Sequence, residues 1–326
     1  MVNDLTTLSG ALIECKDQLI TELANQGVTA TYDPTTGLLG LIHKISEIPT
    51  GTATIVLATN KNILSYYDSE TATLIATHSQ GAGKTVEIYN AVTGSKIGDM
   101  TDNNDGTYSY TYSSTGVGDI SMTAVAGQTE SNSVTIEDCL FYDASSSSNI
   151  SKYTTNNLTH TYDTTEQAYK LQQVSTSNTH GTSTLQNSAF PKDINISLDM
   201  KLINTGTSGS TNNSQPAIKF GNFFARIINA KSANVNRITL MNGQGTADIS
   251  YTNCTITNEV WYHLDLSIES DVVTFTLKQG DTTVATVTGN VSSYLSNTNS
   301  FALAQGVNHE PYTFMKNIKI KPIPSS

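Results

Sequence analysis

The feature that most constrains the fold is a strict alternation of apolar and polar residues in the second half of the chain. In one run, every second position is apolar: Ile194, Ile196, Leu198, Met200 and Leu202. A second run repeats the pattern: Val260, Tyr262, Leu264, Leu266 and Ile268. Because successive side chains of a β-strand point to opposite faces, each run predicts a strand with one buried and one solvated face.

The composition agrees with a protein built from sheets. Hydrophobic residues make up 37% of the 326 residues and charged residues only 14%, so the surface must consist largely of Ser, Thr, Asn and Gly. Such a surface favours exposed sheet and turns over charged helices. The net charge is -11 and the arginines are Arg226 and Arg237, so we expect no nucleic-acid binding. No run of 18 apolar residues predicts a membrane span.

The first fifty residues have a helical period instead. Gly27 suits the end of one helix, and Asp33-Pro34 suits the start of a second. Two short helices cannot bury their apolar stripes alone, which leaves an intramolecular hairpin, self-association or docking on a larger assembly. The first fifty residues have neither the basic cluster nor the long apolar core of a secretion signal, so we expect none here. The expected assembly residues are Leu5, Leu8, Leu12, Leu19, Leu38, Ile42 and Ile45.

Short strands separated by turn signals are expected between residues 51 and 138. Glycine-containing turns occur at residues 81–83, 105–106 and 116–118. This spacing of strands is typical of a β-sandwich. The expected strands are Ala53–Leu57, Thr71–Thr77, Thr85–Asn90, Thr107–Tyr112, Asp119–Val125 and Ser133–Glu137.

Motifs that would indicate catalysis or a cofactor are incomplete. Gly83-Lys84-Thr85 lacks the upstream glycine of a phosphate-binding loop, and residues 102–106 lack the glutamate that an EF-hand needs six positions after its glycine. Retaining glycoside hydrolysis needs two carboxyl groups on one face, and the nearest pair, in Glu269-Ser270-Asp271, is expected in a turn. The cysteines Cys15, Cys139 and Cys254 are too dispersed for zinc and are expected to be free, buried thiols. We therefore expect no catalytic residue, cofactor or metal.

Three resemblances to known families add to this interpretation. Residues 16–45, with the pattern K-D-x-L, then G-V-x-A, then L-x-x-L-I-x-x-I, are similar to the N-terminal segment of tail-associated proteins of phages and proviruses. The stretch DGTYSYTY at residues 105–112 resembles bacterial Ig-like domains of invasin-type adhesins. These two resemblances imply an anchoring segment and a spacer domain.

The third resemblance covers residues 139–326 and is to the concanavalin A-like jelly roll of laminin-G and lectin domains. It rests on CLFYDA (139–144), DINISLDMKL (193–202), EVWYHLDLSIESDVVTFTLKQGD (259–281) and FMKNIKIKPI (314–323). The resemblance implies paired first and last strands, and by family analogy alone a structural Ca²⁺. Trp261 is expected in the core or between the sheets. Glycan sites often pair aromatic faces with polar side chains, and the candidate ligand-binding residues are Tyr142 and Asp143 near the domain entry, Phe224 and Arg226 on one strand, and Asn308, His309 and Tyr312 in the last loop.

The sequence thus predicts a mainly-β protein with a helical hairpin at 1–50, an Ig-like spacer at 51–138 and a jelly roll at 139–326. The function expected from the resemblances is that of a non-enzymatic tail-fibre or adhesin subunit that binds host cell-surface glycan. It would form a homo-oligomer, with a trimer favoured, and contact other virion proteins through residues 1–50. We expect it on a virion tail, assembled in the host cytoplasm. The alternatives are a cellular surface adhesin and a polysaccharide-degrading enzyme on the same fold.

Overall fold

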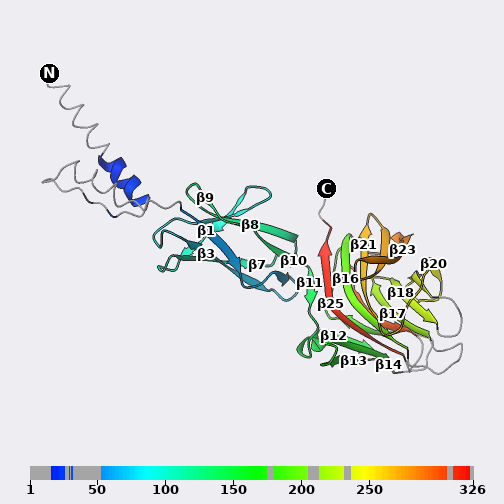
Figure 1. Ribbon diagram of the computed structural model, residues 1–326. Helices are drawn as coiled ribbons and strands as arrows, with labels where there is room; N and C mark the ends of the chain where they lie inside the picture. Colours follow the sequence, from blue (N-terminus) through cyan, green and yellow to red (C-terminus); the bar gives the residue numbers. More distant parts are fainter. Residues whose placement is uncertain are drawn as a thin grey trace, which may run out of the picture. The chain divides into compact units, whose positions relative to one another are not determined.

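The computed structural model is built almost entirely of β-strands (Figure 1), which confirms the predicted mainly-β class. A helix covers residues 16–25, and two 3-10 turns lie at Ser148–Lys152 and Ser292–Tyr294. No helix in the described part of the chain is long and apolar enough to cross a membrane. The structure describes residues 16–25, 29, 31, 53–174, 180–204, 213–230, 236–306 and 311–323.

The chain divides into two compact units. Unit 1 contains the segment that ends at Asn62, together with Thr71–Ser113 and Ile120–Ile136. Unit 2 contains everything from Glu137 onward and two earlier segments, Ile63–Glu70 and Ser114–Asp119.

Two sheets occupy the region between residues 53 and 139, and their strands bury alternate residues. One sheet has the order β1-β3-β7-β6, formed by β1 (Ile55–Thr59), β3 (Thr71–His78), β7 (Thr107–Ser113) and β6 (Thr101–Asp102). The other has the order β2-β10-β8-β4-β5 with β9 on β8, formed by β2 (Ile63–Ser65), β10 (Val134–Cys139), β8 (Gly118–Ala126), β4 (Glu87–Asn90), β5 (Lys96–Asp99) and β9 (Thr129–Glu130).

Every strand predicted in this region overlaps an observed one, but β2, β5, β6 and β9 were missed. These strands have two to four residues, so they are too short to show an alternation.

Unit 2 is a sandwich of two large sheets. The eight-stranded sheet has the order β13-β14-β25-β16-β21-β22-β23, with β11 also paired to β25. Its strands are β11 (Phe141–Asp143), β13 (Leu158–Asp163), β14 (Ala168–Gln173), β16 (Ile194–Ile203), β21 (Trp261–Glu269), β22 (Val272–Gln279), β23 (Thr282–Asn290) and β25 (Tyr312–Pro322).

The seven-stranded sheet has the order β12-β15-β24-β17-β18-β19-β20. Its strands are β12 (Tyr153–Asn156), β15 (Gly181–Leu185), β24 (Phe301–Gly306), β17 (Asn213–Phe220), β18 (Phe223–Ala230), β19 (Arg237–Asn242) and β20 (Asp248–Asn253). One buried cluster joins the two sheets, because Leu198 and Phe275 of the first belong to it together with Phe223 and Leu303 of the second. The predicted alternation of β16 and β21 is confirmed, with the apolar side chains in this core.

The pairing of β11 with β25 confirms that the first and last strands of the predicted jelly roll are neighbours. Phe141 lies opposite Ile320, and Asp143 lies opposite Ile318. Strand β25 also pairs with β14 and β16, so it lies inside the sheet and not at an edge.

A β-bulge in β25 reverses which residues of that strand face outward. Before it, Met315 belongs to the core and Phe314 does not; after it, Ile318 and Ile320 belong to the core. The register against β16 shifts between Ser197 and Asp199, where Asn317 has a positive φ of 55°. An extra residue in one strand produces this reversal. The outer face therefore receives Lys316 and Asn317 in succession.

The core supports a direct stability prediction for unit 2. Phe275→Ala removes a fully buried ring from β22, and we expect it to lower the free energy of unfolding by about 3–5 kcal/mol. Val272→Ala on the same strand, where the side chain is 41% exposed, should change it by less than about 0.5 kcal/mol. Urea denaturation followed by the fluorescence of Trp261, the chain's single tryptophan, reports on this unit. Equal losses in both variants would contradict the assigned core.

Candidate functional site

The outer face of the eight-stranded sheet carries polar side chains in rows, because the register aligns neighbouring strands. In one row Lys321 (β25), Asn195 (β16), Ser267 (β21) and Thr274 (β22) lie opposite one another in turn. The next row contains Lys319, Ser197, Asp265 and Thr276. Strands in a sheet are about 4.8 Å apart, so side chains in a row are close enough to share one ligand.

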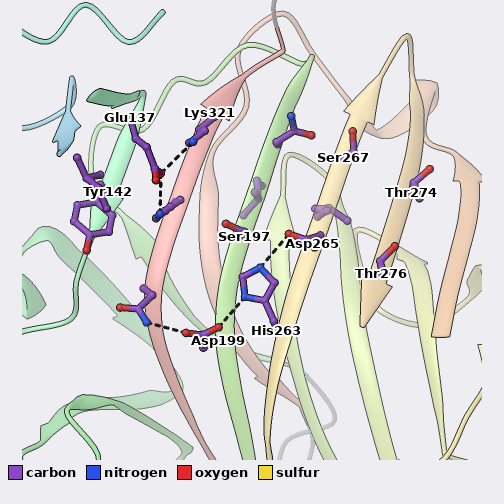
Figure 2. Close-up of a pocket in the computed structure, with 16 residues that line it drawn as sticks. Glu137, Tyr142, Ser197, Asp199, His263, Asp265, Ser267, Thr274, Thr276 and Lys321 are labelled. Carbon is purple, nitrogen blue, oxygen red and sulfur yellow. Dashed lines mark hydrogen bonds and ion pairs between the residues drawn. The ribbon is translucent and has the colours of Figure 1, made fainter. Parts of the chain in front are cut away.

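These rows line a hollow of about 710 Å³ on unit 2 (Figure 2). Figure 2 shows Tyr142 and Glu137 at one side, Thr274 and Thr276 at the other, and Ser197 between them. The lining is predominantly hydrogen-bonding: Glu137, Tyr142, Asn195, Ser197, Asp199, His263, Asp265, Ser267, Thr274, Thr276, Asn317, Lys319 and Lys321, with Ile63, Ile196 and Leu266.

The charged residues of the hollow are paired among themselves. The imidazole of His263 bridges two carboxylates, with Nδ1 2.7 Å from Asp199 Oδ1 and Nε2 3.1 Å from Asp265 Oδ1. The bulge residue Asn317 donates to Asp199 Oδ2 at 2.7 Å, and Lys278 contacts Asp265 Oδ2 at 2.7 Å. We call this network the ladder: it runs from Asn317 through Asp199, His263 and Asp265 to Lys278 and so crosses β25, β16, β21 and β22.

A second charged group lies on the other side of the hollow. Lys319 and Lys321 donate to the same carboxylate oxygen of Glu137, at 2.8 and 3.1 Å, and Lys321 also contacts Asp119 at 2.8 Å. Burial alone raises the pKa of Glu137, but the hydrogen bonds from the two lysines outweigh it and hold the pKa below its ordinary value. Glu137 is thus a carboxylate at neutral pH.

The ladder also shifts the pKa values of its own members. The hydrogen bond to Asp199 raises the pKa of His263 above its ordinary value, against the effect of burial, and the charge of Asp265 adds to it. For Asp199, burial raises the pKa, but the hydrogen bonds from His263 and Asn317 outweigh it and the pKa is lowered. Protonated His263 between two carboxylates is therefore favoured.

Several neutral groups in the hollow remain available to a ligand. Asn195, Ser197, Ser267 and Thr274 have no side-chain hydrogen bond to another described residue, and neither does the hydroxyl of Tyr142. Asn195 is exposed and the others are half-buried. Hydroxyl and amide groups both donate and accept, so this set suits a ligand that also does both.

The sequence-predicted candidates fall in three places. Tyr142 lines the hollow, and Tyr312 lies half-buried on the same face, beside Phe314 with 5.4 Å between ring centroids. Asp143 is fully buried, where it accepts hydrogen bonds from the hydroxyls of Tyr153 at 3.0 Å and Tyr169 at 2.7 Å. These hydrogen bonds link β11, which carries Asp143, to β12 and β14.

Phe224 and Arg226 lie on the other sheet, where their side chains are buried. The Arg226 guanidinium donates to Gln215 Oε1 at 2.9 Å and to His180 Nε2 at 3.0 Å. Burial, and then the charge of Arg226, lowers the pKa of His180 to about 4, so His180 is a neutral acceptor. The His180 ring stacks on Phe224 at 4.8 Å. The two candidates do come together, but away from the hollow.

The remaining expected residues are mostly outside the described part of the chain. This applies to Asn308 and His309 and to the assembly residues Leu5, Leu8, Leu12, Leu38, Ile42 and Ile45. Leu19 is half-buried in the helix at residues 16–25. The candidate ligand-binding and assembly roles stay predictions.

The expectation for Trp261 was wrong. Its indole lies on the outer face of the sheet, half-buried against Ile203 and Phe314, because its strand position has the parity of His263 and Asp265. The alternation of β21 by itself predicts that Trp261 lies on the solvated face, which is where the structure places it.

The described residues contain two free cysteines and no group of three or more His, Cys, Asp or Glu side chains that could hold a metal ion. Cys139 is buried, and burial raises the pKa of its thiol to about 12. Cys254 is half-buried and free as well. Among His, Cys, Asp and Glu of the described ranges, no cluster is arranged to hold a metal ion. The Asp199–His263–Asp265 ladder is a hydrogen-bonded network.

Sequence reasoning missed the ladder and most of the hollow. It recognised the polar faces of β16 and β21, but the pairing of Asp199 with His263 depends on register. The signal that existed was the concentration of charged and hydroxyl residues at alternate positions of the two runs.

Comparisons with known proteins give structural likenesses only. No protein-family model and no curated protein matches the sequence. A Bacillus subtilis protein of unknown function with a galectin-like fold is similar at 10% identity and a TM-score of 0.44, covering 56% of this chain and 96% of that one.

Two further structures are similar to about half of this chain. The exoplasmic/lumenal domain of VIP36 in its Ca²⁺/Man-bound form has 10% identity and a TM-score of 0.42, with 54% of this chain and 84% of that chain covered. The carbohydrate-binding module CBM66 from Bacillus subtilis has 13% identity and a TM-score of 0.38, with 52% and 95% covered.

The ladder predicts a pH dependence centred on His263. Because its folded pKa is raised, its contribution to stability is complete below the unfolded value of about 6.5 and is lost as pH rises through the folded pKa. NMR titration of the His263 ring should give a pKa above that of a free histidine. Asp199→Asn should lower it, because the largest cause of the shift is removed. An unchanged His263 pKa in this variant would contradict the ladder.

Proposed function

We propose that unit 2 binds a carbohydrate in the hollow on its eight-stranded sheet. The observation that carries this proposal is the set of neutral hydrogen-bonding side chains without partners among the described residues: Asn195, Ser197, Ser267, Thr274 and Tyr142. A sugar presents hydroxyls that both donate and accept, and it can meet all of these groups at once. The hollow, at about 710 Å³, falls within the size range of small-ligand sites.

The paired charges around the hollow support this function. The ladder through His263 and the Glu137–Lys321 pair fix the surrounding side chains, so binding costs less ordering of flexible groups. Fixed side chains also give the neutral groups defined positions. Such a site recognises a polyhydroxylated ligand through the directions of its hydrogen bonds and not through the burial of apolar surface.

We further propose that the chain is an adhesin-type subunit of a viral or proviral tail that attaches to a host cell surface. The resemblance of residues 16–45 to tail-associated proteins supports an anchoring role for the N-terminal segment. In this proposal the first fifty residues join other virion proteins and a trimer forms. The stretch that resembles Ig-like domains acts as a spacer, and host-surface polysaccharide or glycoprotein is the partner. Several copies on one particle would strengthen weak individual contacts.

The proposed role is non-enzymatic. Retaining glycoside hydrolysis uses two carboxyl groups about 5–5.5 Å apart, one as the acid and one as the nucleophile. In the hollow, Asp199 and Asp265 are both tied to His263, and Glu137 is tied to two lysines. These bonds support a role in which the carboxylates hold neighbouring side chains in place and do not react with the ligand. Release of reducing sugars during incubation with a bound polysaccharide would favour the enzyme alternative.

A glycan array probed with the full chain tests the proposed site. We expect retention of one or more glycans, and a Kd raised about 30-fold by Asn195→Ala combined with Ser267→Ala, since each of the two removed hydrogen bonds contributes about 1 kcal/mol. Thr288→Ala is the matched control, because Thr288 is exposed on β23, lies opposite Thr274 and is outside the hollow lining. Failure of every glycan to bind would sink the proposal. Unchanged affinity in the double variant would move the site elsewhere.

The assembly proposal has its own test. The mass of the full chain in solution, measured by light scattering, should be a multiple of 34.9 kDa, and three copies are expected. A chain beginning at residue 51 should lose this association. A monomeric full chain would overturn the assembly role of the first fifty residues and leave the glycan site untouched.

A further inference from the structure

The hollow does not end at the ladder. A second hollow of about 300 Å³ begins on its far side, and both are lined by Asp199 and His263. The second one is also lined by Trp261, Lys316 and Gly280. Because the two share Asp199 and His263, they lie next to each other on the sheet face, and we call them together the groove.

The far part of this face is chemically different from the first. Lys316 Nζ lies 4.2 Å from the centre of the Trp261 ring, and Lys201 Nζ lies 5.3 Å from it. On the same face, Lys170 Nζ lies 4.0 Å from the centre of the Tyr312 ring. We call Trp261, Tyr312, Phe314, Lys170, Lys201 and Lys316 the aromatic–lysine strip.

Two lysines of the strip form no ion pair with a described carboxylate. Lys201 pairs with Glu166 at 2.6 Å, and Lys319 and Lys321 pair with Glu137. Among the described residues Lys170 has only a ring contact. Lys316 also forms no ion pair, but it lies opposite Asp199 in the sheet, and its charge helps to lower the pKa of that carboxyl. On a chain with a net charge of -11, two half-buried lysines without an ion pair are a local exception, although Asp199 offsets part of the charge of Lys316.

From this arrangement we propose that the ligand is an anionic polysaccharide whose chain crosses both parts of the groove. The inference rests on the proposed glycan function and names its substrate class. Sugar hydroxyls meet the neutral groups of the first hollow. A carboxylate, sulfate or phosphate on a sugar further along meets Lys316 and Lys170. The aromatic rings beneath these ammonium groups hold them in place through cation–π attraction and offer apolar surface to a sugar ring.

The length of the groove agrees with a chain of several sugars. Ser267 and Trp261 are the outer-face residues at its two ends on β21, six positions apart along the strand. A strand advances about 3.4 Å per residue, so these ends are about 20 Å apart. A single sugar cannot contact both ends, and affinity is therefore expected to rise with the number of sugars.

The test uses the full chain on an array that holds neutral, carboxylated, sulfated and phosphorylated glycans. We expect retained glycans to be anionic, with tighter binding of longer chains. Lys170→Met combined with Lys316→Met should raise their Kd about fivefold for each lysine lost. Lys61→Met, which removes one lysine of unit 1, is the control and should bind as the unaltered chain does. Urea denaturation followed by Trp261 fluorescence checks that the double variant folds.

The outcomes separate the inference from the function on which it rests. Binding of neutral glycans only, or equal affinity of the double lysine variant for anionic ones, overturns the anionic ligand and leaves a glycan-binding protein. Binding of no glycan overturns both. The array classes that are retained distinguish carboxylate from sulfate and phosphate, and added NaCl should weaken the binding of each.

Discussion

The structure of the candidate site depends on the position of strand β25 inside the eight-stranded sheet. This strand pairs with β11, β14 and β16, so it fixes the place of β11 and of the strand that carries Asp199. Its bulge at Asn317 sets which of its residues face the core. The first hollow and the aromatic–lysine strip each include residues of β25, Lys319 and Lys321 after that bulge and Tyr312 and Phe314 before it.

The sequence was sufficient for the sheet faces and insufficient for the site. The alternation of β16 and β21 predicted their buried sides correctly, since every second residue must face the core. The site depends on which strands are neighbours and in what register, and long-range pairing leaves no local pattern. The bulge was equally hidden, because Lys316 and Asn317 look like one more pair in an alternating strand. Its only local sign was an asparagine, a residue that tolerates positive φ.

Burial decided the position of the candidate residues more strongly than their chemistry. Tyr142 and Asp143 are adjacent in the sequence, but the pleat sends Tyr142 to the hollow and Asp143 into the core. In the core, Asp143 accepts from two tyrosine hydroxyls, which is the kind of pairing that a buried carboxylate requires. Arg226 is likewise enclosed by Gln215 and His180. A polar residue near a strand end is thus weak evidence for a ligand site until the face it occupies is known.

The interior position of β25 also has a kinetic consequence. Its pairing with β11 joins Phe141 to Ile320 across roughly 180 residues. Such distant contacts slow folding, because a long loop must close before the pairing can stabilise the chain. Until β25 is in place, β14 and β16 have no strand between them, and their open edges can pair with other chains. The interval between synthesis of β16 and insertion of β25 is therefore the period in which this chain is most exposed to aggregation.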